Sequence, residues 1–416
     1  MTALKARGNN WRTIFALIGS AFGVLFFLVQ AFSLGVLWLT SFLTSQTDLT
    51  QTISTGLLAW ASILSGLMLL PVFLYSFYSL KARPIPRWLV VQGHNFRKIS
   101  RGIILLWPLV VFVGWRLAGS PRAAAFLLGP VNVLVAGLPV LWVYQATQEK
   151  LEGGSPLRKW GIFGFSLTVM PAIVMVLELI AMLILAAFFG LWLTYQISIN
   201  PELEEILMGF VNQLSADPGD LERVIESLES VLLQPAVVFW GLAIIGGIMP
   251  IIEEVIKPLV LWFMAGRRLT PQEGFVGGVL CGAGFALMEN VLYFTTVFVP
   301  EDWLFLALGR AGTGVLHMLT SGVVGWGLAK AWRDGKWLFS ALTLFAAIVL
   351  HAVWNVLALV TGLAPQFLLD ADRTLGQTLL YNAPMVLLLL ISALAMILIN
   401  RHLRKNTDLI PEIGVN

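Results

Sequence analysis

Three charged residues interrupt an apolar stretch in the second half of the sequence. The segment IMPIIEEVIKPLVLWFM runs from Ile248 to Met264, and Glu253, Glu254 and Lys257 lie within about one helical turn of one another in it. A charged side chain at the centre of a bilayer costs at least ~2.5–3.5 kcal/mol on insertion scales. Because the segment is apolar enough to span a membrane, we expect these charges to have a function.

Polar and ionisable side chains recur in the next three apolar segments. They are Glu289 and Asn290 in FALMEN (285–290), Arg310 and His317 in the following segment, and His351 and Asn355 in HAVWN (351–355). At a rise of about 1.5 Å per residue, each of the four helices would place a glutamate or histidine about 20–25 Å from its cytoplasmic end. Such side chains must face one another or a water-filled cavity. The sequence therefore predicts an enclosed polar site.

The paired glutamates are suited to activating water. Two adjacent carboxylates in a low-dielectric environment cannot both be ionised cheaply, so we expect one to be protonated or paired with Lys257. Glu254 is our candidate general base, with Glu253 as its paired neighbour. His351 and Asn355 are four residues apart and share a helix face, where they could donate hydrogen bonds to the oxyanion of a tetrahedral intermediate.

A catalytic zinc ion is the second interpretation of the same residues. Two histidines and a glutamate form a common catalytic Zn²⁺ ligand set, which here would be Glu289, His317 and His351. Water would occupy the fourth position, with Glu254 acting on it. Without metal, Glu254 and His317 would activate the water. We expect supporting roles for Lys257, Asn290 and Arg310, and both interpretations predict hydrolysis of a peptide bond.

Composition places the protein in a lipid bilayer. Of its 416 residues, 58% are hydrophobic and only 12% are charged, whereas a soluble protein is roughly a quarter charged. The net charge of +3 is small and the basic residues lie in short loops, which argues against a nucleic-acid partner. The single cysteine, Cys281, excludes an intramolecular disulfide and a multi-cysteine metal cluster.

Hydropathy predicts an all-α polytopic membrane protein with about ten transmembrane helices. The predicted spans are 13–43, 54–80, 102–118, 124–147, 160–197, 236–265, 272–299, 303–329, 337–362 and 376–400. Loops after even-numbered spans are rich in Lys and Arg, while the others are poor in them. By the positive-inside rule, both termini are cytoplasmic.

Four regions follow from this pattern. Residues 1–198 form a five-span membrane region, and residues 199–234 form an acidic extracytoplasmic segment. Apolar residues recur at helical spacing in that segment, so we expect an amphipathic helical hairpin. It would serve as a solvated connector or, as the alternative, as a cap on which substrate docks. Residues 235–362 form a four-span core that holds the polar residues, and residues 363–416 form the last span and a basic cytoplasmic tail.

The motifs of the core resemble those of a known family. EEVIK (253–257), FALMEN, the Arg310-to-His317 segment and HAVWN together resemble the PrsW family of intramembrane proteases, over about residues 240–360. The paired glutamates and HAVWN also resemble the wider superfamily of CAAX prenyl-protease-like enzymes. The sequence departs from the CAAX-type pattern at Glu289 and Asn290, which replace a histidine, and this leaves the metal question open.

The resemblance implies a membrane-embedded endopeptidase of a prokaryotic plasma membrane, classed by some criteria as a metalloprotease. Its expected substrate is a single-span membrane protein such as an anti-sigma factor. The alternative is a proton-coupled transporter, which would also carry Glu, His and Lys at the midplane. A transporter more typically shows interrupted helices in both halves of the chain. Here the charges lie in one half, which favours an enzyme.

Overall fold

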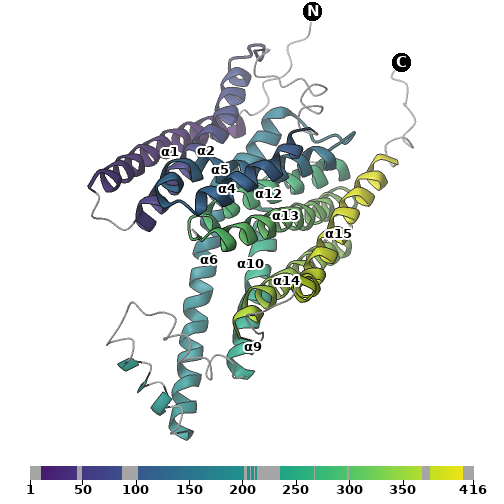
Figure 1. Ribbon diagram of the computed structural model, residues 1–416. Coiled ribbons are helices and arrows are strands. Elements are labelled where there is room, and N and C mark those ends of the chain that lie inside the picture. The colour runs from purple at the N-terminus through teal and green to yellow at the C-terminus, as the bar shows by residue number, and fades with distance from the viewer. Residues whose placement is uncertain are drawn as a thin grey trace, which may run out of the picture. The chain divides into compact units, whose positions relative to one another are not determined.

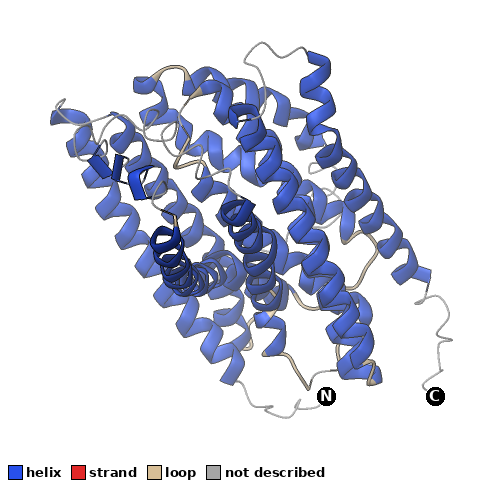
Figure 2. Cartoon of the chain, turned by 90° about the horizontal axis from the view of Figure 1, so that it is seen from below, coloured by secondary structure: helices blue, strands red, loops and turns tan. Residues whose placement is uncertain are grey.

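All regular structure in the described part of the chain is helical. The computed structural model describes residues 11–44, 49–86, 102–200, 235–266, 268–297, 299–367 and 375–405, with short helical pieces between 204 and 212. No strand occurs among these residues (Figure 2). The all-α prediction is confirmed. Most of the acidic 199–234 segment, the basic loop around residues 87–101 and the C-terminal tail beyond residue 405 lie outside the described residues.

The chain divides into two compact units, which we describe separately. Unit 1 comprises Met1–Pro171, Lys257–Ala347 and Leu389–Asn416, and unit 2 comprises Ala172–Ile256 and Ile348–Leu388. Three of the four boundaries fall inside helices, so α6, α14 and α15 each contribute residues to both units.

The N-terminal helices of unit 1 pack against one another (Figure 1). Helix α1 packs along α2, and α5 contacts both α2 and α4. Apolar segments form helices in a bilayer, because a helix satisfies all its backbone hydrogen bonds within itself. In chain order these elements are α1 (Trp11–Thr44), α2 (Leu49–Leu80), the 3₁₀ turn η1 (Ile104–Leu106), α4 (Trp107–Ala118), α5 (Pro121–Thr147) and the start of α6 (Pro156–Ile199).

Two long helices, α12 (Pro271–Tyr293) and α13 (Pro300–Asp334), form the centre of unit 1. They run side by side (Figure 1), and both contact α5. Helix α12 begins with a capping box, in which the Thr270 side chain accepts from the backbone N–H of Glu273 and the Glu273 carboxylate accepts from that of Thr270. Helix α13 ends at Gly335, whose φ of 71° lies in the left-handed region that favours glycine. The short α11 (Leu259–Trp262) also belongs to this unit.

Unit 2 contains the helices that carry the paired glutamates and the HAVWN motif. Its elements are the second part of α6, α9 (Pro235–Ala243), a π-helical turn η2 (Ile244–Ile248), α10 (Met249–Ile256), α14 (Trp337–Phe367) from residue 348 and α15 (Leu375–Lys405) up to residue 388. The rings of Phe189 on α6 and Trp240 on α9 meet edge to face, with centroids 6.3 Å apart. The segment predicted as one span at 236–265 therefore contains a π turn after α9 and a break between α10 and α11.

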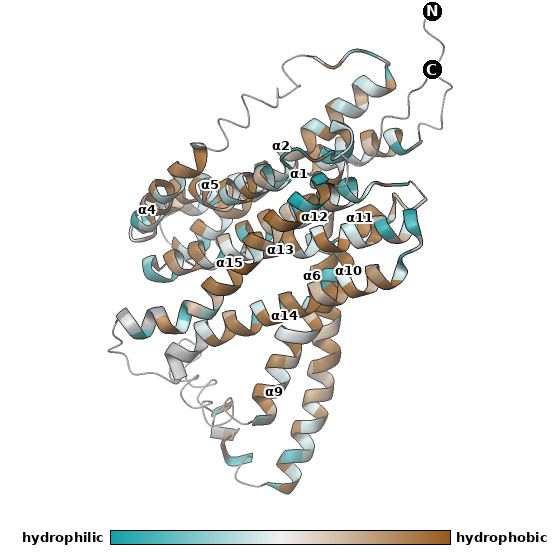
Figure 3. Ribbon diagram, turned by 90° about the vertical axis from the view of Figure 1, so that its right-hand side faces the viewer, coloured by the Kyte–Doolittle hydropathy of each residue, from teal (hydrophilic) through white to brown (hydrophobic). Residues whose placement is uncertain are grey.

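Each of the ten predicted spans contains helix, and eight helical segments are long and apolar enough to cross a membrane. The other two are Ile104–Ala118, which is short, and α13, which has 35 residues but a more polar sequence. Apolar residues dominate most of the helices drawn in Figure 3. The protein is therefore an integral membrane protein, and the cytoplasmic location of both termini stays a prediction.

Candidate active site

Close contact between α12 and α13 positions the polar residues of unit 1. A Cβ atom on Gly282 would overlap the backbone carbonyl of His317, and one on Gly278 would overlap the carbonyl of Ser321. Gly325 of α13 is just as close to the backbone of α12. Small residues at such spacing let two membrane helices approach to backbone contact. The glycines of α12 and α13 therefore allow the two backbones to pack in contact.

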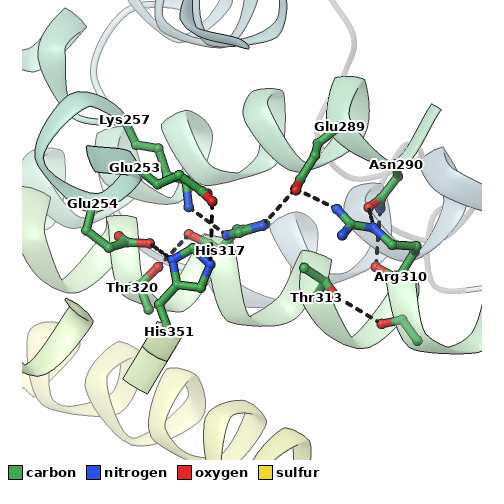
Figure 4. A network of polar contacts seen from close by, with 11 residues as sticks. Glu253, Glu254, Lys257, Glu289, Asn290, Arg310, Thr313, His317, Thr320 and His351 are labelled. Carbon is green, nitrogen blue, oxygen red and sulfur yellow. Dashed lines mark hydrogen bonds and ion pairs between the residues drawn. The ribbon is translucent and has the colours of Figure 1, made fainter. Parts of the chain in front are cut away.

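A series of polar contacts, two hydrogen bonds and one ion pair, runs through unit 1 from Lys257 to Arg310 (Figure 4). Lys257 Nζ lies 2.7 Å from Nδ1 of His317, and both side chains are buried. An ammonium group can only donate, so Nδ1 accepts and the proton of the neutral imidazole lies on Nε2. Nε2 then donates to Oε2 of Glu289 across 2.9 Å. His317 therefore bridges a cation and an anion.

Arg310 closes the other end of this series. Its Nη2 lies 2.5 Å from Oε2 of Glu289, and its Nε donates to Oδ1 of Asn290 across 2.6 Å. Asn290 returns a hydrogen bond from Nδ2 to the backbone carbonyl of Arg310, and the guanidinium lies 4.4 Å from the ring centroid of Tyr293. The same carboxylate oxygen of Glu289 thus contacts both Arg310 and His317. Arg310 is a counter-ion to Glu289 within the unit.

Two aromatic residues of α12 join this network, and the sequence argument did not single them out. The Lys257 ammonium lies 4.7 Å from the ring centroid of Phe285, whose ring also meets that of His317 edge to face at 5.4 Å. Phe285, Glu289 and Tyr293 are four residues apart in sequence, so they share one face of α12. That spacing around Glu289 is the signal that could have found them.

In unit 2, both paired glutamates face His351. Oε1 of Glu254 lies 2.9 Å from Nδ1 of His351, and Oε1 of Glu253 lies 3.8 Å from Nε2. Glu253, Glu254 and His351 are all buried. A carboxylate accepts, so the imidazole proton lies on Nδ1 and points to Glu254. Adjacent glutamates therefore lie near different nitrogen atoms of one ring.

Asn355 makes a backbone contact that the sequence did not predict, and its oxyanion role stays a prediction. Its Nδ2 donates to the backbone carbonyl of Ile245 across 3.1 Å, inside the π turn η2. Asn355 lies one helical turn after His351 on α14, as the motif predicts. The contact thus connects the HAVWN helix to the segment that precedes the paired glutamates.

Three of the buried residues carry atoms that suit a metal ion. Glu253, His317 and His351 can each offer one ligand atom, a carboxylate oxygen or a ring nitrogen. Two histidines and one carboxylate are the ligand types of many catalytic zinc sites.

Comparison with known protein families decides the class of the protein. A family model described as PrsW family intramembrane metalloprotease matches residues 176–391, just over half of the chain. The chain belongs to the PrsW family. Its membership supports intramembrane proteolysis as the general activity, and the PrsW match spans every candidate residue named above. No curated protein and no solved structure matches the chain significantly.

The PrsW match begins inside α6, so α1 to α5 precede it. These preceding helices nevertheless contribute to the packing of unit 1. Trp303, at the start of α13, is fully buried, and its Nε1 donates to Oδ1 of Asn132 on α5 across 3.1 Å. A Cβ atom on Gly114 of α4 would overlap the ring of Trp303. The helices outside the PrsW match therefore support a helix inside it.

Proposed function

We propose that this protein is an intramembrane endopeptidase that hydrolyses a peptide bond of a single-span membrane protein. We further propose that it uses a zinc ion held by Glu253, His317 and His351. One observation carries the metal assignment. Each of the two buried histidines has one ring nitrogen against a carboxylate, Glu289 for His317 and Glu254 for His351. A histidine that binds a metal nearly always donates its other ring N–H to such a group.

The second ring nitrogen of each histidine fits this assignment. In His317 the nitrogen away from Glu289 is Nδ1, which accepts from the Lys257 ammonium at 2.7 Å, so a bound zinc ion would replace one cation with another there. In His351 the nitrogen away from Glu254 is Nε2, and Oε1 of Glu253 is 3.8 Å from it. Two imidazole nitrogens and one carboxylate oxygen are ligands that zinc prefers.

This ligand set differs from the sequence-based one in a single residue. Glu289 was the expected carboxylate ligand, but its Oε2 already accepts from His317 and forms an ion pair with Arg310. A carboxylate neutralised by a guanidinium is a weaker partner for a second cation. We therefore propose Glu253 as the ligand and Glu289 as the residue that orients His317.

Connectivity along the chain supports a single site. Lys257 contacts His317, and Glu253 precedes Lys257 by four residues, which is about one helical turn. The family membership supports it as well, because all of these residues lie within the matched region.

In the proposed reaction, Glu253 transfers the proton and Lys257 stabilises the negative charge. When bound, a zinc ion supplies Lewis-acid polarisation of the attacking water and of the scissile carbonyl. One oxygen of Glu253 faces His351, and the other accepts a proton as the water oxygen bonds to the carbonyl carbon. Lys257 donates to the negatively charged carbonyl oxygen that develops. As the C–N bond breaks, the proton passes from Glu253 to the leaving amine.

Metal content and cleavage, measured on the same preparations, test this function. Detergent-purified wild type is expected to carry about one zinc per chain and to cleave at least one member of a panel of single-span membrane proteins. His317→Ala, His351→Ala and Glu253→Gln are each expected to lose the zinc and the cleavage. The matched control is Thr361→Ala, which removes a buried hydroxyl elsewhere on α14.

Two results would contradict the proposal in different ways. Active wild type that holds no metal and ignores a chelator would eliminate zinc, leaving Glu254 and His317 to activate water. Zinc retained at full stoichiometry in Glu253→Gln, with cleavage lost, would remove Glu253 from the ligand set and leave it as the base.

A further inference from the structure

A π-helical turn lies just ahead of the paired glutamates. The helix formed by α9 and α10 widens at η2 (Ile244–Ile248), five residues before Glu253. A π turn amounts to one residue inserted into an α-helix, and such turns are frequent at functional sites. The sequence of the turn, IIGGI, contains the consecutive glycines Gly246 and Gly247.

Helix α14 contacts this turn at two adjacent positions. Asn355 Nδ2 donates to the carbonyl oxygen of Ile245 across 3.1 Å. A Cβ atom on Gly246 would lie only 2.6 Å from Cγ2 of Val356, so a larger residue would push the turn away from α14. One contact is a directional hydrogen bond and the other is steric. Together they fix both the rotation of the turn and its distance from α14.

We propose that Asn355 and Gly246 are positioning residues that lock the π turn and thereby hold Glu253 and Glu254 against His351. An α-helix turns about 100° per residue, so losing the inserted residue would rotate both glutamates away from the imidazole. Asn355 acts in this way through the backbone of Ile245 and not on the substrate. The proposal rests on the proposed function only for what Glu253 and His351 do.

The first test distinguishes a positioning role of Asn355 from a role as oxyanion donor. Asn355→Ala is expected to weaken zinc binding 10–100-fold, as loss of a residue that supports a ligand does. Its kcat is expected to fall with KM unchanged. Backbone amides of residues 244–256 are expected to exchange hydrogen faster than in wild type. Asn355→Asp, which offers an acceptor where a donor is needed, is expected to behave like Asn355→Ala, and Thr361→Ala is the control expected to change none of these quantities.

The second test changes the size of the side chains at positions 246 and 356. Gly246→Ala is expected to reduce zinc affinity and kcat, because its methyl group collides with Val356. Adding Val356→Ala, which removes the colliding atoms, is expected to restore both quantities towards wild type. Val356→Ala alone serves as the matched control.

The Asn355→Ala variant could instead bind zinc and exchange hydrogen like wild type, yet cleave 10²–10³-fold more slowly. That result would identify Asn355 as an oxyanion donor and contradict its positioning role. Failure of Val356→Ala to rescue Gly246→Ala would overturn the steric part. If the wild type binds no zinc, the metal assignment fails separately. Two measurements then still test the positioning role: the hydrogen exchange of residues 244–256, and the recovery of kcat when Val356→Ala is added to Gly246→Ala.

Discussion

Glu254 lies 2.9 Å from Nδ1 of His351, and both side chains are buried. The preceding residue, Glu253, lies 3.8 Å from the other ring nitrogen, Nε2. Residues adjacent on a helix point about 100° apart, so the two carboxylates reach different nitrogen atoms of the ring. The proposed function accordingly gives the two glutamates different roles: Glu254 orients the ring, and Glu253 acts on the side of Nε2.

We predict that the two glutamates respond differently to substitution. Glu254→Gln keeps an oxygen that can accept from Nδ1 of His351, so it should retain more cleavage and more zinc than Glu254→Ala. Glu253→Gln should abolish cleavage, because an amide cannot take a proton from water. Initial cleavage rates and metal content of the three purified variants provide the measurement. Equal and complete inactivity of Glu254→Gln and Glu254→Ala would instead identify Glu254 as the general base.

We predict that Arg310 stabilises unit 1. Arg310→Ala removes the counter-ion of Glu289 and the hydrogen bond to Asn290, so it should lower the free energy of unfolding by about 2 kcal/mol. Thermal unfolding in detergent measures the effect as a reduced Tm. Lys330→Ala breaks a more exposed ion pair with Asp334, so it should change stability by less than about 0.5 kcal/mol. An unchanged Tm for Arg310→Ala would show that the ion pair contributes little.

We predict that His317 depends on the glycine contacts between α12 and α13. Gly282→Ala places a methyl group against the backbone carbonyl of His317, so it should separate the helices and strongly reduce zinc content and cleavage. Gly309→Ala is the control on α13, because its Cβ atom would meet nothing within 4 Å. Zinc content and cleavage should stay near wild type in the control. Matching behaviour of the two variants would argue against a need for close approach at Gly282.

We predict that residues 199–234 face away from the cytoplasm. Both termini and the loops near residues 90, 155, 268 and 333 should face towards it. The reason is the alternation of basic and non-basic loops along the chain. Single cysteines introduced on a Cys281→Ser background, labelled from each side with an impermeant reagent, test the assignment. Labelling of the 199–234 segment only from the cytoplasmic side would reverse the topology.

The sequence by itself determined that the protein is an α-helical membrane protein and where its helices lie. Long apolar runs leave a chain in lipid no alternative to helix or closed barrel, and each of the ten predicted spans contains helix. The sequence also determined which side chains are candidates, because ionisable residues in such runs are rare and need partners. The rise of about 1.5 Å per residue set their expected depths without any knowledge of packing.

Only the tertiary structure decided which of these side chains meet. Depth along a helix follows from residue number, but the rotation and closeness of two helices depend on the packing between them. The glycines of α12 place its backbone against α13, and Glu289 thereby pairs with Arg310 and His317. Asn355 binds a carbonyl in a π turn that hydropathy cannot reveal, because inserting one apolar residue into a long apolar helix leaves its composition the same.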